Sequence, residues 1–560
     1  MAPTPFRHDV VIMGGGLAGL TLALQLKQRF GDIDVVVLER RPHPVPHAAH
    51  KVGESSVEIG AHYFDTVLGL KAHLHGAQLR KFGFRFFFSE GRRDIDQVTE
   101  IGASRYLSVP SYQIDRGIFE NYLAEEATRA GVRFVDDALV RRIELAQVPQ
   151  DSFGDHDRSR SRGDADDPQA LHRLEWTQDG ETRVAHARWL VDACGRAGLL
   201  KRKLGLAQAN AHACNAVWFR IGARITIDHW SDNAQWRARC EPQARWLSTN
   251  HLVGTGYWVW LIPLASGSHS VGIVADPRMH PLETMDSFDK AMDWFRRWQP
   301  RLFDELDGQR HLLQDFAFFR NFSYGCKQVF SGQRWALTGE AGLFLDPFYS
   351  PGSDFIAMSN TYITDLIAHD RAGHSVAARA QLYDQIYHSF YESTLALYRD
   401  QYALFGDPEV LPVKVIWDYT YYWGVLSQIF FQQRLTDLAL LGTVREELQH
   451  CQRLNVAMQD FLRAWSDKSA KRNPPVMLDQ AALPWFAELN RSLNDRLDDE
   501  GFKARMRASA TQLRELAGEI LRRACAEHPG LDNGALRAVL ADHVPTSPAQ
   551  APASPLLFDA

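Results

Sequence analysis

A glycine-rich turn near the start of the chain has the residue types and the spacing that bind a dinucleotide. Gly14, Gly16 and Gly19 form a G-x-G-x-x-G pattern directly after an apolar, β-branched run that ends at Met13. In this pattern the first glycine allows a sharp turn, the second lets the backbone approach a pyrophosphate, and the third lets the next helix pack on the strand. The N–H groups at the start of that helix then face the phosphates. The turn therefore predicts a bound dinucleotide.

The segments around this turn are the ones that must position it. Residues 9–13 predict a first strand, a helix begins near Ala18, and residues 35–38 predict a second strand. Glu39 follows at the point where a carboxylate can accept hydrogen bonds from a ribose. The buried side of the helix is predicted to carry Leu20, Ala23, Leu24 and Leu26. The full strand–turn–helix–strand setting makes the glycine motif specific.

Lys81 and Arg116 have residue types that suit chemistry, but their spacing alone does not decide their roles. Lys81 stands at the start of a strand predicted from Phe82, Phe84 and Phe86, which alternate with Gly83 and Arg85. A lysine in this place is usually a surface charge. Arg116, near the start of a predicted helix, suits either a phosphate contact or a first-turn salt bridge.

Trp258 and Trp260 lie one residue apart in a predicted strand, so they point to the same face and form an aromatic wall. Taken alone, the pair is more commonly explained by packing in the core. Later, Ser350, Gly352 and Ser353 lie in a loop that leads into a helix. The free amides of that helix start suit a small anion.

Composition excludes several classes of protein. The chain has 560 residues, 45% of them hydrophobic, and a net charge of −6, which argues against a general nucleic-acid binder. The basic run 201–203 is interpreted as a solvated face. Six cysteines without a C-x-x-C pattern indicate no zinc site and a reducing compartment. His43, His47 and His50 lack accompanying ligands, so we predict no metal. Without a signal peptide or a membrane-spanning run, a cytoplasmic protein is expected.

The order of elements predicts an α/β fold with three regions. A Rossmann-type FAD-binding lobe is expected over 1–80, 100–210 and 320–365, and a β-rich substrate lobe over 81–99 and 211–319. A mainly helical C-terminal region, 366–545, is expected to cover the substrate pocket, followed by a disordered tail, 546–560. The polar run 150–169 is expected to be a mobile loop. The aromatic stretch 416–433 suits either core packing or the wall of a pocket for a flat substrate.

Several of these motifs together resemble the flavin-dependent halogenases. They are the GGGLAG loop, VGESS, Lys81, W-V-W-L-I-P at 258–263 and FLDPFYSPG at 344–352. The resemblance covers about residues 8 to 365, and the double-tryptophan segment is its most specific part. It implies a fold of the glutathione-reductase and p-hydroxybenzoate-hydroxylase type (GR2/PHBH-like) with FAD as the cofactor, supplied as FADH2 by a separate NAD(P)H-dependent flavin reductase.

The resemblance also implies a reaction. A flavin hydroperoxide oxidises chloride or bromide to hypohalous acid, which travels through an internal tunnel to the lysine that matches Lys81. An ammonium group has three donors, so it can orient and polarise this oxidant; a deprotonated lysine can instead become a chloramine. Both roles stay open.

The resemblance assigns the remaining site residues. Lys81 is catalytic. Cofactor-binding residues are Gly14, Gly16, Leu17, Ala18, Gly19, Glu39, Arg40, Gly53, Glu54, Ser55, Arg116, Asp192, Gly339, Glu340, Asp346 and Pro347. Halide-binding residues are Ser350, Gly352 and Ser353. The flavin-side barrier is Trp258, Trp260, Ile262 and Pro263.

Two departures from the family pattern bear on the substrate. Tyr349 stands where the tryptophan-halogenating members have a glutamate, and Pro351 has no N–H to offer a halide. A missing base is tolerable for a phenol, whose ring oxygen stabilises the cationic intermediate, so we expect a small phenolic substrate of specialised metabolism, such as antibiotic biosynthesis. The alternatives are an FAD-dependent aromatic hydroxylase, a halogenase acting on a carrier-tethered aryl or pyrrole group, and a flavin-binding protein without enzymatic activity.

Overall fold

The structure is a computed structural model that describes residues 6–47, 53–146, 171–542 and 557–558. The predicted mobile loop 150–169 lies outside the described residues, and so does the predicted tail 546–560 apart from Leu557 and Phe558. Within the described ranges, no helix combines the length and the apolar character needed to cross a membrane.

The first sheet is built around the dinucleotide motif. Its main strand order is β18-β19-β10-β1-β2-β7, and β1, β2, β7, β10 and β19 run parallel. The predicted first strand, helix and second strand are present as β1, α1 and β2. The strands are β1 (Phe6–Met13), β2 (Val35–Leu38), β7 (Arg133–Val135), β8 (Leu139–Glu144), β9 (His172–Gln178), β10 (Glu181–Asp192), β18 (Phe330–Ser331) and β19 (Trp335–Leu337). The four apolar residues predicted for the buried side of α1 (Leu17–Arg29) are buried.

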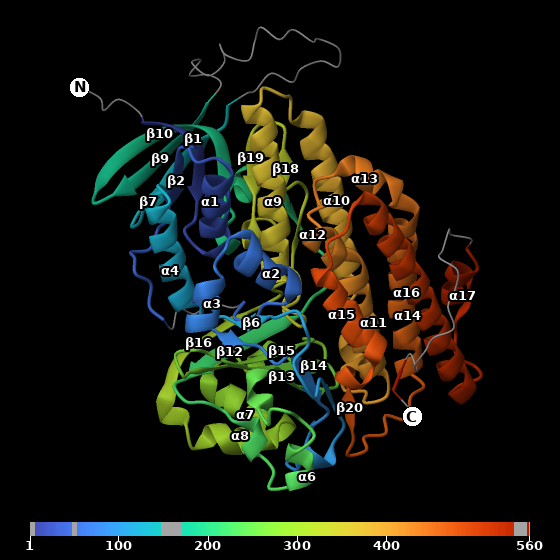
Figure 1. Ribbon diagram of the computed structural model, residues 1–560. Coiled ribbons are helices and arrows are strands. Elements are labelled where there is room, and N and C mark those ends of the chain that lie inside the picture. Colours follow the sequence, from blue (N-terminus) through green and yellow to red (C-terminus); the bar gives the residue numbers. More distant parts are fainter. Residues whose placement is uncertain (1–5, 48–52, 147–170, 543–556, 559–560) are drawn as a thin grey trace.

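The register of this sheet brings three loops together. Met13 pairs with Leu38 on one side and with Asp192 on the other, and Asp192 pairs with Leu337. The parallel strands therefore end in line, and the loops that follow them meet at one edge. Helices α1, α4 (Arg116–Arg129) and α9 (Gly352–Arg371) lie beside this sheet (Figure 1).

A second sheet lies below the first in Figure 1 and has the order β16-β12-β15-β14-β13-β4-β5-β20. All pairs are antiparallel except β13·β4 and β20·β5. Its strands are β4 (Phe84–Phe87), β5 (Glu100–Gly102), β12 (Asn215–Ile221), β13 (Thr249–Gly254), β14 (Tyr257–Pro263), β15 (His269–Ala275), β16 (Leu313–Phe319) and β20 (Met477–Asp479). Helices α6 (Ala234–Arg237), α7 (Phe288–Trp298) and α8 (Pro300–Asp307) cover its outer side.

This sheet differs from the predicted boundaries in two places. Residues from 100 onward were expected in the first lobe, yet β5 pairs with β4 in the second sheet. The C-terminal region was expected to be helical, yet it contributes β20 as the edge strand. Both strands have three residues, which is too short for the alternation of apolar and polar residues to reveal them.

Buried charges also depart from the expected pattern. Arg85 was expected to alternate with the apolar face of its strand, but it is fully buried. It pairs with Glu100, whose carboxylate also accepts a hydrogen bond of 2.8 Å from Nε of Arg245. Lys201, expected on a solvated face, is buried and donates from Nζ to the Gly342 carbonyl oxygen at 2.9 Å. In both cases a partner distant in sequence satisfies the charge.

The C-terminal third forms a helical layer beside both sheets, drawn in orange and red in Figure 1. Residues predicted at helical spacing from Phe502 to Ile520 are buried in α16. A π-helical segment, Tyr422–Ser427, separates α11 from α12. The helices after α9 are α10 (Ala377–Leu395), α11 (Val410–Tyr421), α12 (Gln428–Phe431), α13 (Leu438–Thr443), α14 (Arg445–Ser466), α15 (Pro484–Arg491), α16 (Asp499–Glu527) and α17 (Gly534–Ala541).

Shorter elements connect the layers. The predicted helix near residues 57–68 is present as α2 (Glu58–His62) followed by a π-helical turn, Tyr63–Val67. The others are α3 (Lys71–Ala77), β3 (Leu79–Arg80), β6 (Tyr112–Gln113), α5 (Leu199–Lys203), β11 (Ala207–Gln208) and β17 (Gly325–Cys326).

Candidate active site

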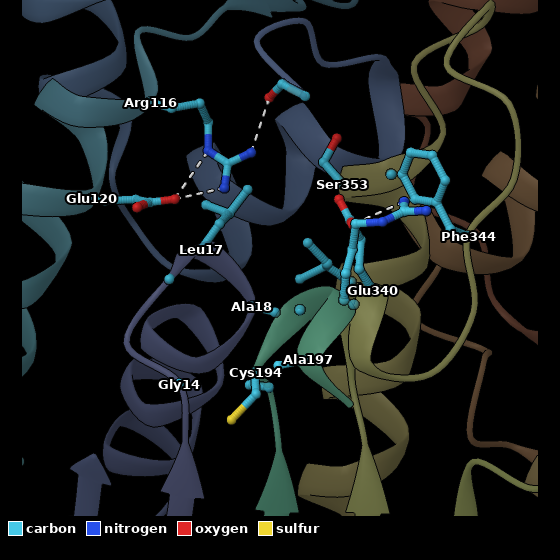
Figure 2. A pocket seen from close by; sticks show the side chains of 18 of the residues that line it. Gly14, Leu17, Ala18, Arg116, Glu120, Cys194, Ala197, Glu340, Phe344 and Ser353 are labelled. Carbon is cyan, nitrogen blue, oxygen red and sulfur yellow. Dashed lines mark hydrogen bonds and ion pairs between the residues drawn. The ribbon is translucent and has the colours of Figure 1, made fainter. Parts of the chain in front are cut away.

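A large cavity opens at the carboxyl ends of β1, β10 and β19 (Figure 2). Its volume is about 690 Å³, and the glycine turn at Gly14 forms one wall. Loops after the ends of parallel strands are the usual place for a nucleotide in an open α/β sheet. The size is within the range of cofactor sites.

Most of the residues that were predicted to bind the cofactor line this cavity. They are Gly14, Gly16, Leu17, Ala18, Glu39, Arg40, Gly53, Glu54, Ser55, Arg116, Gly339, Glu340, Asp346 and Pro347. Two predicted residues do not line it. Gly19 is needed for packing, because a Cβ there would lie 2.0 Å from the Gly14 carbonyl oxygen. Asp192 is buried, and its carboxylate accepts from the N–H groups of Cys194 at 3.0 Å and Leu200 at 2.7 Å. Asp192 therefore holds the turn after β10.

The glycine turn fits the pyrophosphate and ribose of FAD. Gly16 precedes α1 and provides no side-chain cap, so the first N–H groups of the helix are left for a ligand. The carboxylate of Glu39 accepts from Gly15 N–H at 2.7 Å and from Arg41 N–H at 3.0 Å. A carboxylate has about four acceptor positions, so Glu39 retains capacity for ribose hydroxyls.

Gly14→Ala should damage this turn. Gly14 has φ +109°, and a Cβ there would lie 2.3 Å from the Ala193 carbonyl oxygen. We expect a loss of about 1–3 kcal/mol in the free energy of unfolding, as for other strained backbone positions, and a weaker affinity for FAD. Urea unfolding and FAD titration measure the two effects. Gly31→Ala is the control, because nothing lies within 4 Å of its Cβ position; equal losses in both variants would contradict the role of the turn.

Arg116 combines the two roles that the sequence left open. Its guanidinium pairs with Glu120 at 2.6 Å in the first turns of α4, and it also donates to the Gly53 carbonyl oxygen at 3.4 Å (Figure 2). It therefore ties the cavity wall at Gly53 to α4. Glu54, next to it, is paired with the buried Arg220. Burial raises the pKa of Glu54 despite this arginine.

Lys81 is buried, with 3% of its surface exposed, which excludes the expected surface position. It lies between β3 and β4. Its ammonium group donates to Ser55 Oγ at 2.9 Å and to the Ser56 carbonyl oxygen at 3.1 Å, and it lies 3.3 Å from the centre of the Phe84 ring. Burial lowers the pKa of Lys81 to about 7, although Glu58 and Asp354 favour the charged form.

Two buried carboxyl groups act on this lysine. Asp354 accepts from Gly60 N–H at 2.8 Å and from the Tyr422 hydroxyl at 2.7 Å. Burial raises its pKa to about 8, against the effect of these hydrogen bonds. Burial also raises the pKa of Glu58, whose Oε2 has no hydrogen-bond partner among the described residues. Lys81, Glu58 and Asp354 thus form a cluster of three buried titratable side chains that affect one another's pKa values.

A second, smaller cavity lies on the other side of Lys81. Its volume is about 50 Å³, and it shares the wall residues Pro351 and Phe355 with the first cavity. Ser55, a hydrogen-bond partner of Lys81, lines the first cavity, whereas Phe84, beneath the ammonium group, lines the second. The wall is largely aromatic and comes mostly from the C-terminal helices: Tyr349, Tyr398, Asp418, Tyr419, Tyr421, Tyr422 and Leu426. Lys81 is therefore placed between two cavities of different character.

The tryptophan pair forms a wall of the first cavity. Trp258 and Trp260 both line it, their ring centres 5.7 Å apart, and Ile262 lines it as well. Pro263, predicted as part of this barrier, is buried in β14 but does not line the cavity. Gly272 on β15 makes room for Trp260, because a Cβ at Gly272 would lie 2.2 Å from the indole ring.

A buried polar network holds Trp258 in place. Its indole N–H donates to the Tyr402 hydroxyl at 3.0 Å, and Asp346 accepts from Tyr402 at 2.5 Å and from His212 at 2.6 Å. His212, Cys214 and Asp346 lie close enough to be considered as metal ligands. However, Asp346 also accepts from Phe348 N–H at 2.9 Å, so its oxygens are already engaged. We interpret the cluster as a hydrogen-bond network.

The turn predicted to bind a halide faces the first cavity. Ser350, Gly352 and Ser353 line it, and Gly352 and Ser353 begin α9. Ser353 Oγ is buried without a hydrogen-bond partner in the described part of the chain. Gly60 leaves the space for this hydroxyl, because a Cβ there would lie 2.3 Å from Ser353 Oγ. The site for a small anion is therefore available at this helix start.

The sequence missed several residues of the second cavity. Asp354 directly follows Ser353 and was assigned no role. Glu58, which comes shortly after VGESS, does not line this cavity but acts on Lys81, and it was also missed. Asp418 and Tyr422 lay in the aromatic stretch whose pocket interpretation the structure supports. Their proximity to those motifs was the available signal, but only the fold brings them to Lys81.

Comparisons with known proteins agree with this architecture. Residues 12–73 match the NAD(P)-binding Rossmann-like domain. The fold matches the crystal structure of halogenase PltM with a TM-score of 0.62, 16% identity and coverage of 93% of this chain and 96% of that one. A second structure, PltM with phloroglucinol and FAD, gives 0.60 over 91% and 96% at 16% identity. The fold is therefore that of the halogenase PltM, and the first cavity lies beside the Rossmann-like part of the chain.

The proteins most useful for comparison by sequence are halogenases. Flavin-dependent halogenase chlA from Dictyostelium discoideum is 24% identical over 75% of this chain and 70% of its own length. Flavin-dependent halogenase ptaM from Pestalotiopsis fici is 25% identical over 62% and 61%. The carrier-protein pyrrole chlorinase of Pseudomonas fluorescens is 25% identical over 62% and 72%. The chain thus spans about three fifths to seven tenths of these relatives. The chain is therefore similar to flavin-dependent halogenases over most of its length, in agreement with the resemblance of its motifs.

Proposed function

We propose that this protein is an FADH2- and O2-dependent halogenase that chlorinates or brominates a small phenol through Lys81. The observation that carries the proposal is the buried amine of Lys81 between two cavities that share Pro351 and Phe355. A freely diffusing oxidant formed beside the flavin would reach the substrate cavity past this amine. Reduced FAD from a separate reductase would supply the oxidising chemistry with O2.

Residues of this chain would bind the halide, separate the substrate from the flavin and orient the oxidant. Ser353 Oγ and the first N–H groups of α9 would hold the halide in the first cavity. Trp258 and Trp260 would keep the substrate away from the flavin. Lys81 would orient hypohalous acid with the ammonium proton that is not donated to Ser55 or Ser56. Electrostatic stabilisation by a fixed donor at a buried site is the strongest effect available here.

The second cavity favours a small phenolic ring as the substrate. It is narrow and rich in aromatic side chains, and its polar side chains are five tyrosines, Thr394 and two carboxyl groups. The crystal structure of PltM with phloroglucinol, a similar fold, supports this choice. The pyrrole chlorinase among the relatives supports a carrier-tethered substrate instead, but the small volume is less suited to a tethered arm.

Incubation with FAD, a flavin reductase, NADH, O2 and bromide tests the proposal. We expect mass spectrometry to detect brominated products from small phenols within a panel of phenols and indoles. Gain of oxygen without bromine would instead indicate an aromatic hydroxylase. Absence of any product, with FAD bound, would contradict the proposed activity.

A further inference from the structure

Aromatic halogenation needs an acceptor for the ring proton. The electrophile adds to a ring carbon, and the C–H bond of that carbon must then break to restore aromaticity. Tyr349 occupies the expected position of a base, but its hydroxyl donates to Asp418 at 2.8 Å and burial raises its pKa well above the ordinary value. Asp418 is itself held by Lys414 at 2.8 Å and by Gln459 at 2.8 Å. Neither group is free to act.

Asp354 lies at the second cavity, the proposed substrate site, where a proton acceptor is needed. It is in the first turn of α9, lines the second cavity and is buried. The preceding residue, Ser353, lines the first cavity. The start of α9 therefore separates the two cavities and presents a carboxyl group to the second. Gly60 N–H and the Tyr422 hydroxyl hold this group in place and occupy one acceptor position on each oxygen.

We propose that Asp354 is a further catalytic residue, whose carboxylate accepts the ring proton of the substrate during halogenation. The proposal rests on the proposed function. In the reaction, a ring carbon forms a bond to the halogen of hypohalous acid, and the halogen–oxygen bond breaks. The oxygen leaves as water with a proton from Lys81. The C–H electron pair then returns to the ring, and the proton moves to Asp354.

Lys81 and Asp354 must both regain their starting protonation states after each turnover. After one turnover Lys81 is neutral and Asp354 is protonated, so the proton must return to Lys81. No hydrogen bond or ion pair joins the two side chains among the described residues, so the proton would travel through the bound phenol or a water molecule. The pKa of Lys81 is lowered to about 7 and that of Asp354 is raised to about 8, in each case first by burial, so this transfer has a small free-energy difference. Other titratable groups that face Asp354 are Glu58 on α2, Tyr422 on the π-helical segment and Tyr398.

Asp354→Asn tests the proposal, because it keeps the size of the side chain and removes the base. We expect bromination of a phenol to fall by about 10²-fold, the usual contribution of a general base, with FAD binding and hypohalous acid release unchanged. In competition between ring-deuterated and unlabelled phenol, the native enzyme should show an isotope effect near unity. The variant should show an effect clearly above unity, because ring proton loss becomes slow.

Two matched variants separate this role from structural effects. Asp365→Asn changes a carboxylate near the other end of α9 and should behave as the native enzyme. Glu58→Gln removes the neighbouring carboxyl group and should keep the isotope effect near unity, whatever its rate. A native rate and isotope effect in Asp354→Asn would overturn the proposal, as would a raised isotope effect in Glu58→Gln alone. Failure of the native enzyme to brominate any phenol would instead contradict the proposed function.

Discussion

Replacing Lys81 by methionine should lower the yield of halogenated product by about 10³-fold or more while FAD binding and the oxidation of reduced flavin continue. Methionine has a similar length but no donor, so hypohalous acid is no longer oriented toward the substrate. The expected magnitude follows because Lys81 is the group that touches lining residues of both cavities, Ser55 and Phe84. Product is measured by mass spectrometry, and hypohalous acid that escapes is measured with a trapping dye.

Lys71→Met is the control for this variant. Lys71 is an exposed lysine at the start of α3, and its loss should leave product formation unchanged. If Lys81→Met halogenated at the native rate, the amine would have no part in the reaction. Loss of FAD binding in Lys81→Met would show that the lysine acts on the first cavity instead.

The pH dependence distinguishes the two roles that the sequence left open for Lys81. Its three neighbours, Ser55, Ser56 and the Phe84 ring, accept hydrogen bonds or attract a cation, so we expect the ammonium form to be active. Because the pKa of Lys81 is lowered to about 7, product formation should decline as the pH rises beyond the titration of the Lys81–Asp354 pair. Deprotonation of Asp354, whose pKa is raised to about 8, would also increase the rate, so only a rate that keeps rising well above that pKa would favour the neutral amine and a haloamine.

Glu100→Gln should lower the free energy of unfolding by about 3–5 kcal/mol, the usual cost of removing one partner from a buried ion pair. Glu100 is fully buried between Arg85 and Arg245, so a neutral amide would leave Arg85 without its paired carboxylate and Arg245 with Asp228 alone, at 3.6 Å. The side chain keeps its shape, so lost packing contributes little. Urea unfolding followed by tryptophan fluorescence measures the change. Glu283→Gln, which breaks an exposed pair with Arg320, is the control and should have no measurable effect.

The pairing of Glu100 with Arg85 and Arg245 also predicts how the stability of the fold changes on acidification. Burial tends to raise the pKa of Glu100, but the charges of Arg85 and Arg245 outweigh it, so the pKa is lowered in the folded state. The stability it contributes is therefore present above the pKa of an unfolded glutamate, and it is lost as the pH falls through the lower folded pKa. The native protein should lose this contribution on acidification, whereas Glu100→Gln should not. Parallel pH profiles for the two proteins would contradict this account.

Local sequence patterns predicted much of the FAD lobe. β1, α1 and β2 follow from a β-branched run, three glycines and a helical period, which are all properties of neighbouring residues. Trp258 and Trp260 were expected on one face of a strand, and β14 places them so. The helix start after Ser350 was expected, and α9 begins at Gly352.

Contacts between distant residues were the part that local patterns could not predict. Arg85 and Lys201 look like surface charges, because their partners Glu100 and Gly342 lie elsewhere in the chain. The edge strand β20 joins the second sheet from more than 370 residues beyond its partner β5. Asp192 was predicted to bind the cofactor, yet its carboxylate accepts hydrogen bonds from the backbone of the turn that comes after it.

The sequence by itself determined that this chain binds FAD and resembles the halogenases, because those properties depend on motifs whose residues are close together along the chain. Only the tertiary structure decided that Lys81 is buried between two cavities and that Asp354 shares its surroundings. Lys81 lies between β3 and β4, Asp354 lies in α9, and the helical layer covers both. Burial among these elements, rather than residue type, shifts their pKa values toward each other and makes proton exchange between them feasible.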